Sequence, residues 1–294
     1  PISYHKQGLD EQICKHFNLD FSKKLNLSRW TKIKEIQRSS DGNVNIGIVG
    51  KYTSMIDAYK SLIEAINHGG LDNNVKVTIK WVNSESLEDQ NLNLINFFKD
   101  INGIIVPGGF GERGSEGKIN AIKYARENNI PFFGICLGMQ LAVIEIAQNV
   151  LKIKNAHSSE FKKTTKSVVG LMTEWVNKNK IEKRDKNSDK GGTMRLGAYK
   201  AILKKNSKIF SIYKNKVISE RHRHRYEVNQ KFLSKFENKG YYFSGMSPDG
   251  LLPEVLESKK HKWFIGVQFH PELKSRPLDP HPLFVSFIKA AIND

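Results

Sequence analysis

One apolar segment, residues 131–147, constrains the fold of this chain more than any other feature. Its length suggests a membrane span, but Gly134 and Gly138 interrupt it and polar residues lie within it. A buried strand over 131–135, a tight turn and a helix ending near Asn149 account for the pattern better. An apolar strand that leads at once into a helix is typical of a parallel sheet with helices on both faces.

The sequence before this segment alternates strands and helices in the same way. Strands are predicted at 46–50, 75–81 and 103–106, and the apolar residues after the first and third of them recur at helical spacing. This order indicates parallel strands joined by helical crossovers.

The first of these helices has predicted boundaries at both ends. Ser54 and Asp57 are expected to form a capping box that opens it. Gly69 and Gly70 are expected to end it, because glycine is the commonest residue just past a helix C-terminus.

The second half of the chain changes character. A Pro-Asp-Gly turn at 248–250 separates two strand-like runs, which indicates antiparallel strands, and an apolar strand at 262–269 precedes a closing helix. The charged stretch 177–190 is interpreted as a surface loop. The predicted fold class is α/β, with a mainly parallel central sheet flanked by helices and additional antiparallel strands in the C-terminal half.

Residues 1–42 differ from the rest of the chain. They are polar, helical in pattern and end in a turn-rich stretch at 39–43, so we place a domain boundary there and expect one globular domain over 43–294. Because Pro1 stands where a methionine would begin a chain, we expect a cut or processed piece. No apolar segment follows a basic N-terminal flank, so we expect a cytoplasmic protein.

Composition limits the classes of function. The 47 Lys and Arg residues against 30 acidic ones give a formal net charge of +17, which raises nucleic-acid binding as a hypothesis. The excess is lysine-rich, scattered and without an aromatic-interleaved basic motif, so nucleic acid is not the expected partner. The two cysteines form no disulfide framework and no zinc pattern.

Cys136 lies between Gly134 and Gly138, where the apolar strand meets the helix. This is the spacing of a nucleophile elbow, a tight turn that presents one side chain at the edge of a sheet. The positive end of the following helix dipole would favour a thiolate. The alternative is a small apolar side chain buried at the end of a core strand.

A nucleophilic cysteine needs a base, and nine histidines are available. His222 and His224 alternate on a strand and could share a metal, whereas the only carboxylate near His281 in sequence is Asp279. His270 ends the apolar strand at 262–269, and Glu272 would point the same way if the backbone stays extended. His270 is therefore the preferred base and Glu272 its orienting carboxylate.

A glycine-rich turn, Pro-Gly-Gly-Phe-Gly at 107–111, follows another buried strand. Its backbone N–H groups can form an oxyanion hole together with the N–H of Leu137. A phosphate-binding loop is the alternative, but the turn lacks the Gly-Lys-Ser/Thr ending.

Three segments together resemble the class I glutamine amidotransferases, in their usual chain order: 107–111, Gly-Ile-Cys-Leu-Gly-Met-Gln at 134–140 and Gln-Phe-His-Pro-Glu at 268–272. Further stretches resemble the glutaminase domains of one branch of that family, the CTP synthases. These stretches are Gln-Gly-Leu-Asp at 7–10, Gly-Lys-Tyr at 50–52, Ser-Glu-Phe at 159–161, Gly-Gly-Thr-Met-Arg-Leu-Gly at 191–197 and Glu-Arg-His-Arg-His-Arg-Tyr-Glu-Val-Asn at 220–229. The resemblance covers nearly the whole chain.

The resemblance implies a role for each matching residue. Cys136 is the nucleophile, His270 the general acid and base, and Glu272 its orienting carboxylate. The family's contacts to L-glutamine fall on Gly109, Leu137, Gly138, Met139, Gln140, Glu160 and Arg225. Of these, Glu160 suits the α-ammonium and Arg225 the α-carboxylate. No metal or other cofactor is assigned to this domain.

The resemblance also implies what the complete protein does. L-glutamine is hydrolysed to glutamate and ammonia, and an absent N-terminal synthase domain uses the ammonia, ATP and Mg²⁺ to aminate UTP to CTP. Residues 1–42 resemble the linker after that domain, GTP activates the glutaminase, and 191–197 form part of a lid. Assembly into homo-oligomers is expected only of the complete protein.

Two alternatives to this function stay open. The first is the glutaminase of another class I amidotransferase or a γ-glutamyl hydrolase, both using the same nucleophile. The second is a noncatalytic nucleotide-binding module.

Overall fold

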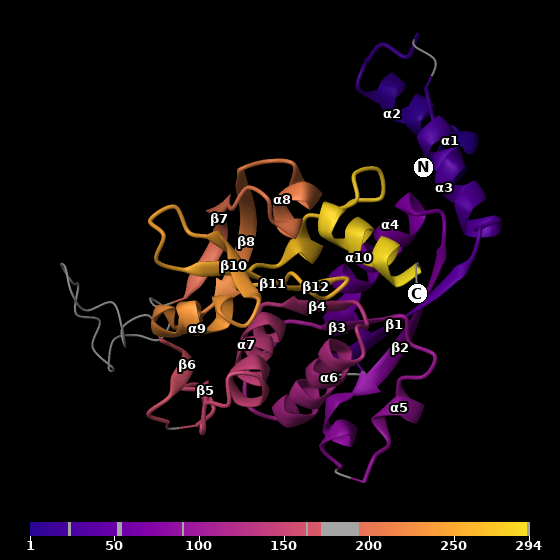
Figure 1. Ribbon diagram of the computed structural model, residues 1–294. Helices are drawn as coiled ribbons and strands as arrows, with labels where there is room; N and C mark the ends of the chain where they lie inside the picture. Colours follow the sequence, from indigo (N-terminus) through magenta and orange to yellow (C-terminus); the bar gives the residue numbers. More distant parts are fainter. Residues whose placement is uncertain (23–24, 52–54, 90, 163, 172–193, 293–294) are drawn as a thin grey trace.

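The computed structural model describes residues 1–22, 25–51, 55–89, 91–162, 164–171 and 194–292 (Figure 1). The strands are β1 (Asn43–Gly50), β2 (Lys76–Asn83), β3 (Gly103–Val106), β4 (Phe132–Ile135), β5 (His157–Ser158), β6 (Ser167–Leu171), β7 (Arg195–Leu203), β8 (Val217–His224), β9 (Tyr226–Val228), β10 (Tyr241–Met246), β11 (Pro253–Ser258) and β12 (Phe264–Val267). The helices are α1 (Ile2–Lys6), α2 (Leu9–His16), α3 (Ser28–Arg38), α4 (Lys60–Asp72), α5 (Leu94–Phe97), α6 (Ser115–Glu127), α7 (Leu137–Asn149), α8 (Lys208–Tyr213), α9 (Leu233–Glu237) and α10 (Pro282–Ile292), with 3₁₀ turns η1 (Ile56–Tyr59), η2 (Ser84–Glu88), η5 (Gln230–Phe232) and η6 (Pro271–Leu273).

Within the described ranges, nine strands form one mixed sheet in the order β2-β1-β3-β4-β12-β11-β10-β7-β8. The pairs from β2 to β12 are parallel, and those from β12 to β8 are antiparallel. Strands β5, β6 and β9 form a smaller sheet beside it. The predicted fold class is thus confirmed, including the antiparallel strands of the C-terminal half.

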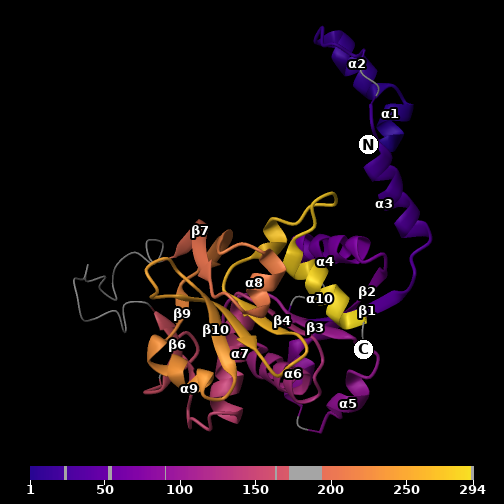
Figure 2. The same cartoon turned by 45° about the horizontal axis from the view of Figure 1, so that its top comes forward.

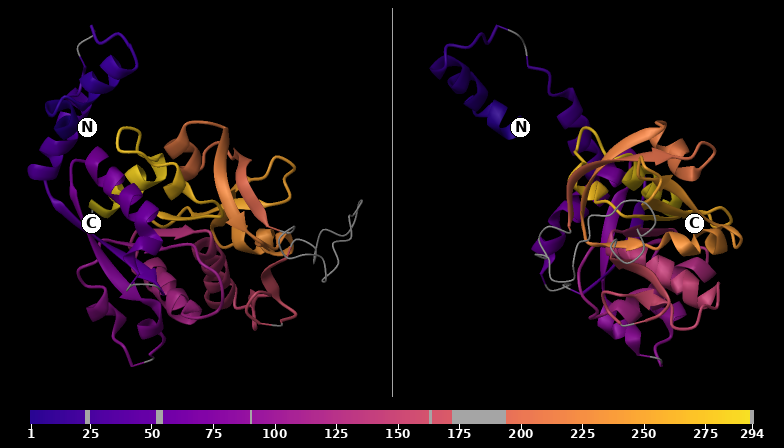
Figure 3. Two further views of the ribbon diagram at one scale, coloured as in Figure 1. Left: turned by 180° about the vertical axis from the view of Figure 1, so that it is seen from behind. Right: turned by 90° about the vertical axis from the view of Figure 1, so that its left-hand side faces the viewer.

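Helices cover the parallel part of the sheet on both faces (Figures 1 and 3). Helices α6 and α7 lie on one face, and α4 and α10 lie on the other. Each face has its own apolar core, in which β-branched and aromatic side chains of the strands pack against the covering helices. Because both faces are buried, β3 and β4 are apolar throughout rather than alternating.

The predicted end of the first helix is wrong. Helix α4 continues through Gly69 and Gly70 to Asp72. A Cβ on Gly69 would lie 2.8 Å from the carbonyl oxygen of Phe284 in α10, and one on Gly70 would lie 2.6 Å from Cγ2 of Val77 in β2. The glycines therefore permit close packing inside the helix, and this tertiary contact outweighs their low helix propensity.

Two other expectations fall partly or wholly outside the described residues. Ser54 of the predicted capping box is not among them, and α4 begins at Lys60, directly after η1. The stretch 177–190 also lies outside them.

The N-terminal helices α1, α2 and α3 project from the sheet on the side of α4 (Figures 1 and 2). None of the three contains a buried residue, and apolar side chains such as Tyr4 and Phe17 are exposed. The guanidinium of Arg29 donates a hydrogen bond to the carbonyl of Leu278. Strand β1 begins at Asn43, so the predicted boundary after residue 42 coincides with the start of the sheet. The assignment of 1–42 as a separate linker segment stays a prediction.

In the described part of the chain, the helices are too short or too polar to cross a membrane.

Candidate active site

Cys136 occupies the turn between β4 and α7, in a strained backbone conformation with φ 52° and ψ −103°. Such a conformation costs about 1–3 kcal/mol and persists only where the surrounding structure imposes it. A Cβ on Gly138 would lie 2.0 Å from the carbonyl oxygen of Val106 in β3, and one on Gly134 would lie 2.8 Å from the backbone of Gly138. The two glycines let strand and helix approach closely enough to form the elbow that the sequence predicts.

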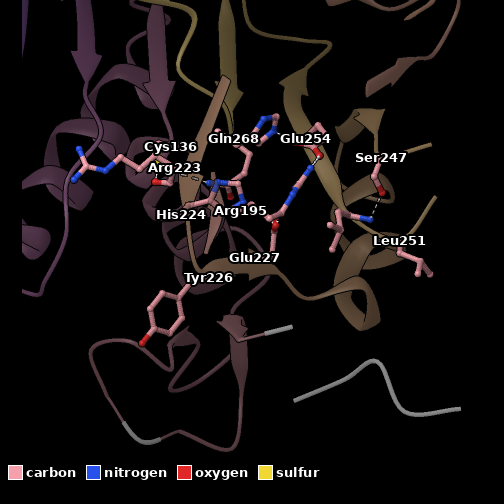
Figure 4. Close-up of polar contacts among 12 residues, drawn as sticks. Cys136, Arg195, Arg223, His224, Tyr226, Glu227, Ser247, Leu251, Glu254 and Gln268 are labelled. Atoms are coloured by element: carbon pink, nitrogen blue, oxygen red, sulfur yellow. Dashed lines mark hydrogen bonds and ion pairs between the residues drawn. The ribbon is translucent and has the colours of Figure 1, made fainter. Parts of the chain in front are cut away.

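The Cys136 side chain is 3% exposed, and its sulfur has polar neighbours on two sides (Figure 4). The thiol lies 3.8 Å from the carbonyl oxygen of Arg223 in β8, and Nε2 of Gln268 lies 3.8 Å from the sulfur. Because α7 begins directly after the cysteine, its positive dipole end also faces the sulfur. These surroundings are unlike those of an inert apolar cysteine in a core.

His270 follows β12, which lies next to β4 in the sheet, so the histidine reaches the same edge as Cys136. Its Nδ1 is 2.7 Å from Oε1 of Glu272, as predicted. The predicted reason is wrong, because the backbone does not stay extended: His270 is the N-cap of the 3₁₀ turn η6, which contains Glu272. The backbone N–H of His270 donates to the carbonyl of Arg221 in β8 at 2.7 Å.

The pKa of His270 is raised to about 10. Burial alone lowers this pKa, but the hydrogen bonds and negative charges supplied by Cys136 and Glu272 outweigh it. The imidazole is thus held protonated at neutral pH, between the sulfur and the carboxylate. A protonated imidazole beside a nucleophilic sulfur can serve as a general acid in the first step of acyl transfer.

The stability of the domain should depend on pH through His270. Its folded pKa lies above the value of about 6.5 for an unfolded histidine, so protonation stabilises the fold. The contribution is complete below about pH 6.5 and is lost as pH rises toward the folded pKa of about 10. Urea unfolding of the native chain and of His270→Asn should therefore give free energies whose difference shrinks between pH 7 and pH 10; parallel curves would contradict the assignment.

A pocket of about 370 Å³ opens over the cysteine and the histidine. Both catalytic candidates and Glu272 line it, together with the glycine-rich turn after β3. The remaining lining residues are Ala58, Tyr59, Ser61, Leu62, Pro107, Gly108, Gly109, Phe110, Arg223 and Leu273. Its size suits a small molecule such as an amino acid.

Only one of the predicted glutamine contacts is among the residues that line this pocket. Gly109 lines it, and Leu137 is the first residue of α7, next to Cys136. Glu160 accepts a hydrogen bond from the N–H of Gly111 at 3.0 Å. Burial raises the pKa of Glu160, opposed by that hydrogen bond and by the charges of Lys51 and Arg225, so Glu160 and Arg225 interact electrostatically.

The other three predicted contacts, Gly138, Met139 and Gln140, are not among the residues that line the pocket. Gly138 packs against β3, and Met139 is fully buried against Gly266 of β12. The amide Nε2 of Gln140 donates to the carbonyl of Tyr226 at 2.8 Å and to Oε1 of Gln268 at 3.1 Å. Any contact that Gly138 and Met139 make with a ligand in the pocket therefore involves their backbone.

The alternating strand at 221–225 does place His222 and His224 on one buried face. They pair with carboxylates: His222 Nε2 is 2.8 Å from Glu254, and His224 Nε2 is 2.7 Å from Glu227. Arg195 joins the two carboxylates, at 3.0 Å from Glu227 and 2.8 Å from Glu254 (Figure 4). We call these five residues the buried ion cluster.

Among the described residues, no group of three or more His, Cys, Asp or Glu side chains is placed to hold a metal ion.

His281 has a carboxylate partner that its sequence neighbours do not reveal: its Nε2 lies 3.2 Å from Oε1 of Glu220 in β8. Asp279, the only carboxylate near His281 in sequence, pairs with Arg276 through backbone hydrogen bonds in an isolated β-bridge.

Some residues of the site were missed by the sequence analysis. Phe110 and Arg223 line the pocket, with the guanidinium of Arg223 5.9 Å from the ring centroid of Phe110. Gln268 is fully buried beside the sulfur. In the sequence, Gln268 could have been recognised as a polar residue at the end of an otherwise apolar strand. Arg223 alternates with His222 and His224, which indicates that its side chain lies on the opposite, outer face of the strand.

The predicted lid at 191–197 is described only in part. Residues 191–193 lie outside the described ranges, whereas Arg195 and Gly197 belong to β7. The side chain of Arg195 is 11% exposed in the buried ion cluster.

Comparison with known proteins agrees with this geometry. Residues 54–290 match the family model described as glutamine amidotransferase class-I. CTP synthases of Agrobacterium fabrum and Rhodospirillum rubrum are each 57% identical over 292 residues, which cover 99% of this chain and 54% of each relative. A solved structure of the Trypanosoma brucei CTPS glutaminase domain with bound acivicin is 38% identical, with a TM-score of 0.77, over 85% of this chain and 94% of that one.

The chain belongs to the class I glutamine amidotransferase family. The elbow cysteine and the histidine–glutamate pair line one pocket, and the roles that the resemblance implies for them stay predictions. Within the family it is a glutaminase domain of the CTP synthase type. It spans about half the length of the curated relatives it matches.

Proposed function

We propose that this domain hydrolyses the side-chain amide of L-glutamine through a thioester on Cys136. The observation that carries the proposal is the strained cysteine that lines the pocket, beside a His270 that the sulfur and Glu272 together keep protonated. The solved relative with bound acivicin supports a small-molecule site in this fold.

In the first step the Cys136 sulfur attacks the amide carbon of glutamine. The C–S bond forms as the carbonyl oxygen gains negative charge, which the N–H groups of Gly109 and Leu137 stabilise. The protonated His270 then donates its proton to the amide nitrogen, the C–N bond breaks and ammonia leaves. A γ-glutamyl thioester remains on the cysteine.

In the second step the neutral His270 accepts a proton from water while the water oxygen attacks the thioester carbon. The oxyanion forms at the same N–H groups, and the C–S bond breaks to release glutamate. The sulfur departs as a thiolate next to a newly protonated imidazole. Glu272 holds the ring in one orientation throughout both steps.

The two ends of glutamine have complementary partners. We assign Glu160 to the α-ammonium, because a bound ammonium would offset the burial that raises the pKa of this carboxyl. The buried Nε of Arg225 has no hydrogen-bond partner within the described part of the chain, so its guanidinium is available for the α-carboxylate. Leu137, Gly138, Met139 and Gln140 contribute through the first turn of α7.

We further propose that the complete protein is a glutamine-hydrolysing CTP synthase in the cytoplasm. Residues 1–42 would link this domain to a synthase domain that holds ATP and Mg²⁺ and aminates UTP with the released ammonia. GTP would activate glutamine hydrolysis, with 191–197 as part of a lid, and copies would assemble through the synthase domain. The exposed apolar side chains of α1 and α2 agree with a segment that contacts another domain.

The test uses the protein with its synthase domain restored. CTP formation from UTP and ATP should proceed with either L-glutamine or ammonium chloride as nitrogen source, and GTP should increase only the glutamine-dependent rate. Cys136→Ala should abolish CTP formation from glutamine and keep it from ammonium. Glutamate release without CTP formation would favour a γ-glutamyl hydrolase or the glutaminase of another synthase; no glutamate release at all would favour the noncatalytic module.

Substitution of Gly108 by alanine should disable the site although it replaces no catalytic side chain. A Cβ there would lie 2.7 Å from Cε1 of His270, so the imidazole must move, whereas a Cβ on Gly109 meets only Cδ2 of Leu137 at 3.5 Å. We expect Gly108→Ala to lower kcat for glutamate release by about 100-fold and Gly109→Ala by much less. Equal losses in the two variants, with unchanged melting temperatures, would contradict the placement of His270.

A further inference from the structure

Gln268 is a fully buried amide that none of the steps above uses. It directly follows β12, and its side chain is 0% exposed. Its backbone N–H donates to the carbonyl of Glu254 at 2.9 Å, which fixes its main chain against β11. Its Nε2 lies 3.8 Å from the Cys136 sulfur, within hydrogen-bond distance for a sulfur acceptor.

The orientation of this amide follows from its other contacts. The carbonyl of Tyr226 can only accept a hydrogen bond, so Gln140 must turn its NH₂ group toward it, at 2.8 Å. The same NH₂ group is 3.1 Å from Gln268 and therefore requires an acceptor there, which is Oε1. The NH₂ group of Gln268 consequently faces the sulfur (Figure 4).

The sulfur meets two donors and one acceptor. The Arg223 carbonyl can accept from the neutral thiol, whereas the Gln268 amide and the His270 imidazolium can donate to the thiolate. Other ionisable groups around this point are Arg223, which lines the same pocket, Glu272 beside His270, and the buried ion cluster. His270 gives up its proton when ammonia departs, but an amide cannot.

We propose that Gln268 is a further catalytic residue, whose N–H group stabilises the Cys136 thiolate, and that Gln140 and the Tyr226 carbonyl position it. Its donor persists through the cycle, so it assists the sulfur both as nucleophile and as leaving group. The role in turnover rests on the proposed glutaminase activity, but the stabilised thiolate does not require glutamine.

The test measures the thiol directly. In a Cys14→Ser background, where Cys136 is the remaining cysteine, the rate of alkylation by iodoacetamide is followed from pH 5 to pH 10. Gln268→Met should shift the midpoint upward by about one pH unit and slow alkylation below the midpoint by about tenfold, with the same plateau at high pH. Gln268→Glu, which retains an acceptor for Gln140 but turns an oxygen to the sulfur, should shift it further in the same direction.

Two more variants separate this role from packing. Gln140→Leu should shift the midpoint in the same direction but by less, because it frees the Gln268 amide to turn. Gln148→Leu, on the same helix, removes an amide that donates to Ala156 at 2.9 Å, away from the thiol, and should shift nothing. An unchanged midpoint in every folded Gln268 and Gln140 variant overturns the inference, whereas a shifted midpoint in a domain that releases no glutamate overturns only the proposed function.

Discussion

Cys136→Ala is expected to reduce glutamate release from L-glutamine by at least about 10⁴-fold. The sulfur is the atom that bonds to the substrate, and the Gln268 amide beside it is not a nucleophile and cannot replace it. The measurement is coupled detection of glutamate, with and without GTP.

Cys14→Ala is the matched control. This cysteine lies in α2, which has no buried residue, and the variant should release glutamate at the native rate. Equal loss in the two variants, or substantial release by Cys136→Ala, would contradict the assignment of the nucleophile.

Glu254→Gln is expected to lower the free energy of unfolding by about 3 kcal/mol. Glu254 is fully buried and pairs with both Arg195 and His222, so its loss removes one of the two buried counter-charges of Arg195 and the carboxylate partner of His222. Thermal or urea unfolding measures the change.

Glu237→Gln is the control for the buried ion cluster. Glu237 pairs with Lys204 at 3.0 Å, but both side chains are well exposed, at 39% and 53%. Such a surface pair contributes less than about 1 kcal/mol. Equal destabilisation by the two substitutions would contradict the role of the cluster.

The buried ion cluster also bears on catalysis, because it fixes the inner face of β8. Carbonyls of that strand contact both catalytic residues: Arg221 accepts from the N–H of His270, and Arg223 lies against the Cys136 sulfur. Folded Glu254→Gln should therefore show a lower kcat for glutamate release, with KM less affected.

Local sequence was sufficient to predict the elbow. Two glycines around Cys136, after an apolar strand and before a helix, have few structural solutions, and parallel strands bring His270 to the same edge. Glu272 was also predicted, although its contact arises through a 3₁₀ turn and not an extended backbone. Histidine and carboxylate two residues apart can meet in either conformation, so the partner could be predicted and the geometry could not.

Features that depend on distant partners were not predictable. Gly69 and Gly70 have the local signature of a helix end, and only their contacts with α10 and β2 show why the helix continues. The buried ion cluster likewise joins residues from β7, β8, β9 and β11. Alternation in β8 indicates which histidines are buried, but not which carboxylates meet them.

The most direct measurement of the central claim is the mass of the Cys136 peptide after acid quenching during glutamine turnover. The thioester mechanism predicts an adduct on Cys136 equal in mass to one glutamine less one ammonia, which disappears when the glutamine is exhausted and never forms in Cys136→Ala. Sustained glutamate release with no such adduct, in a domain whose Cys136→Ala variant remains active, would contradict it.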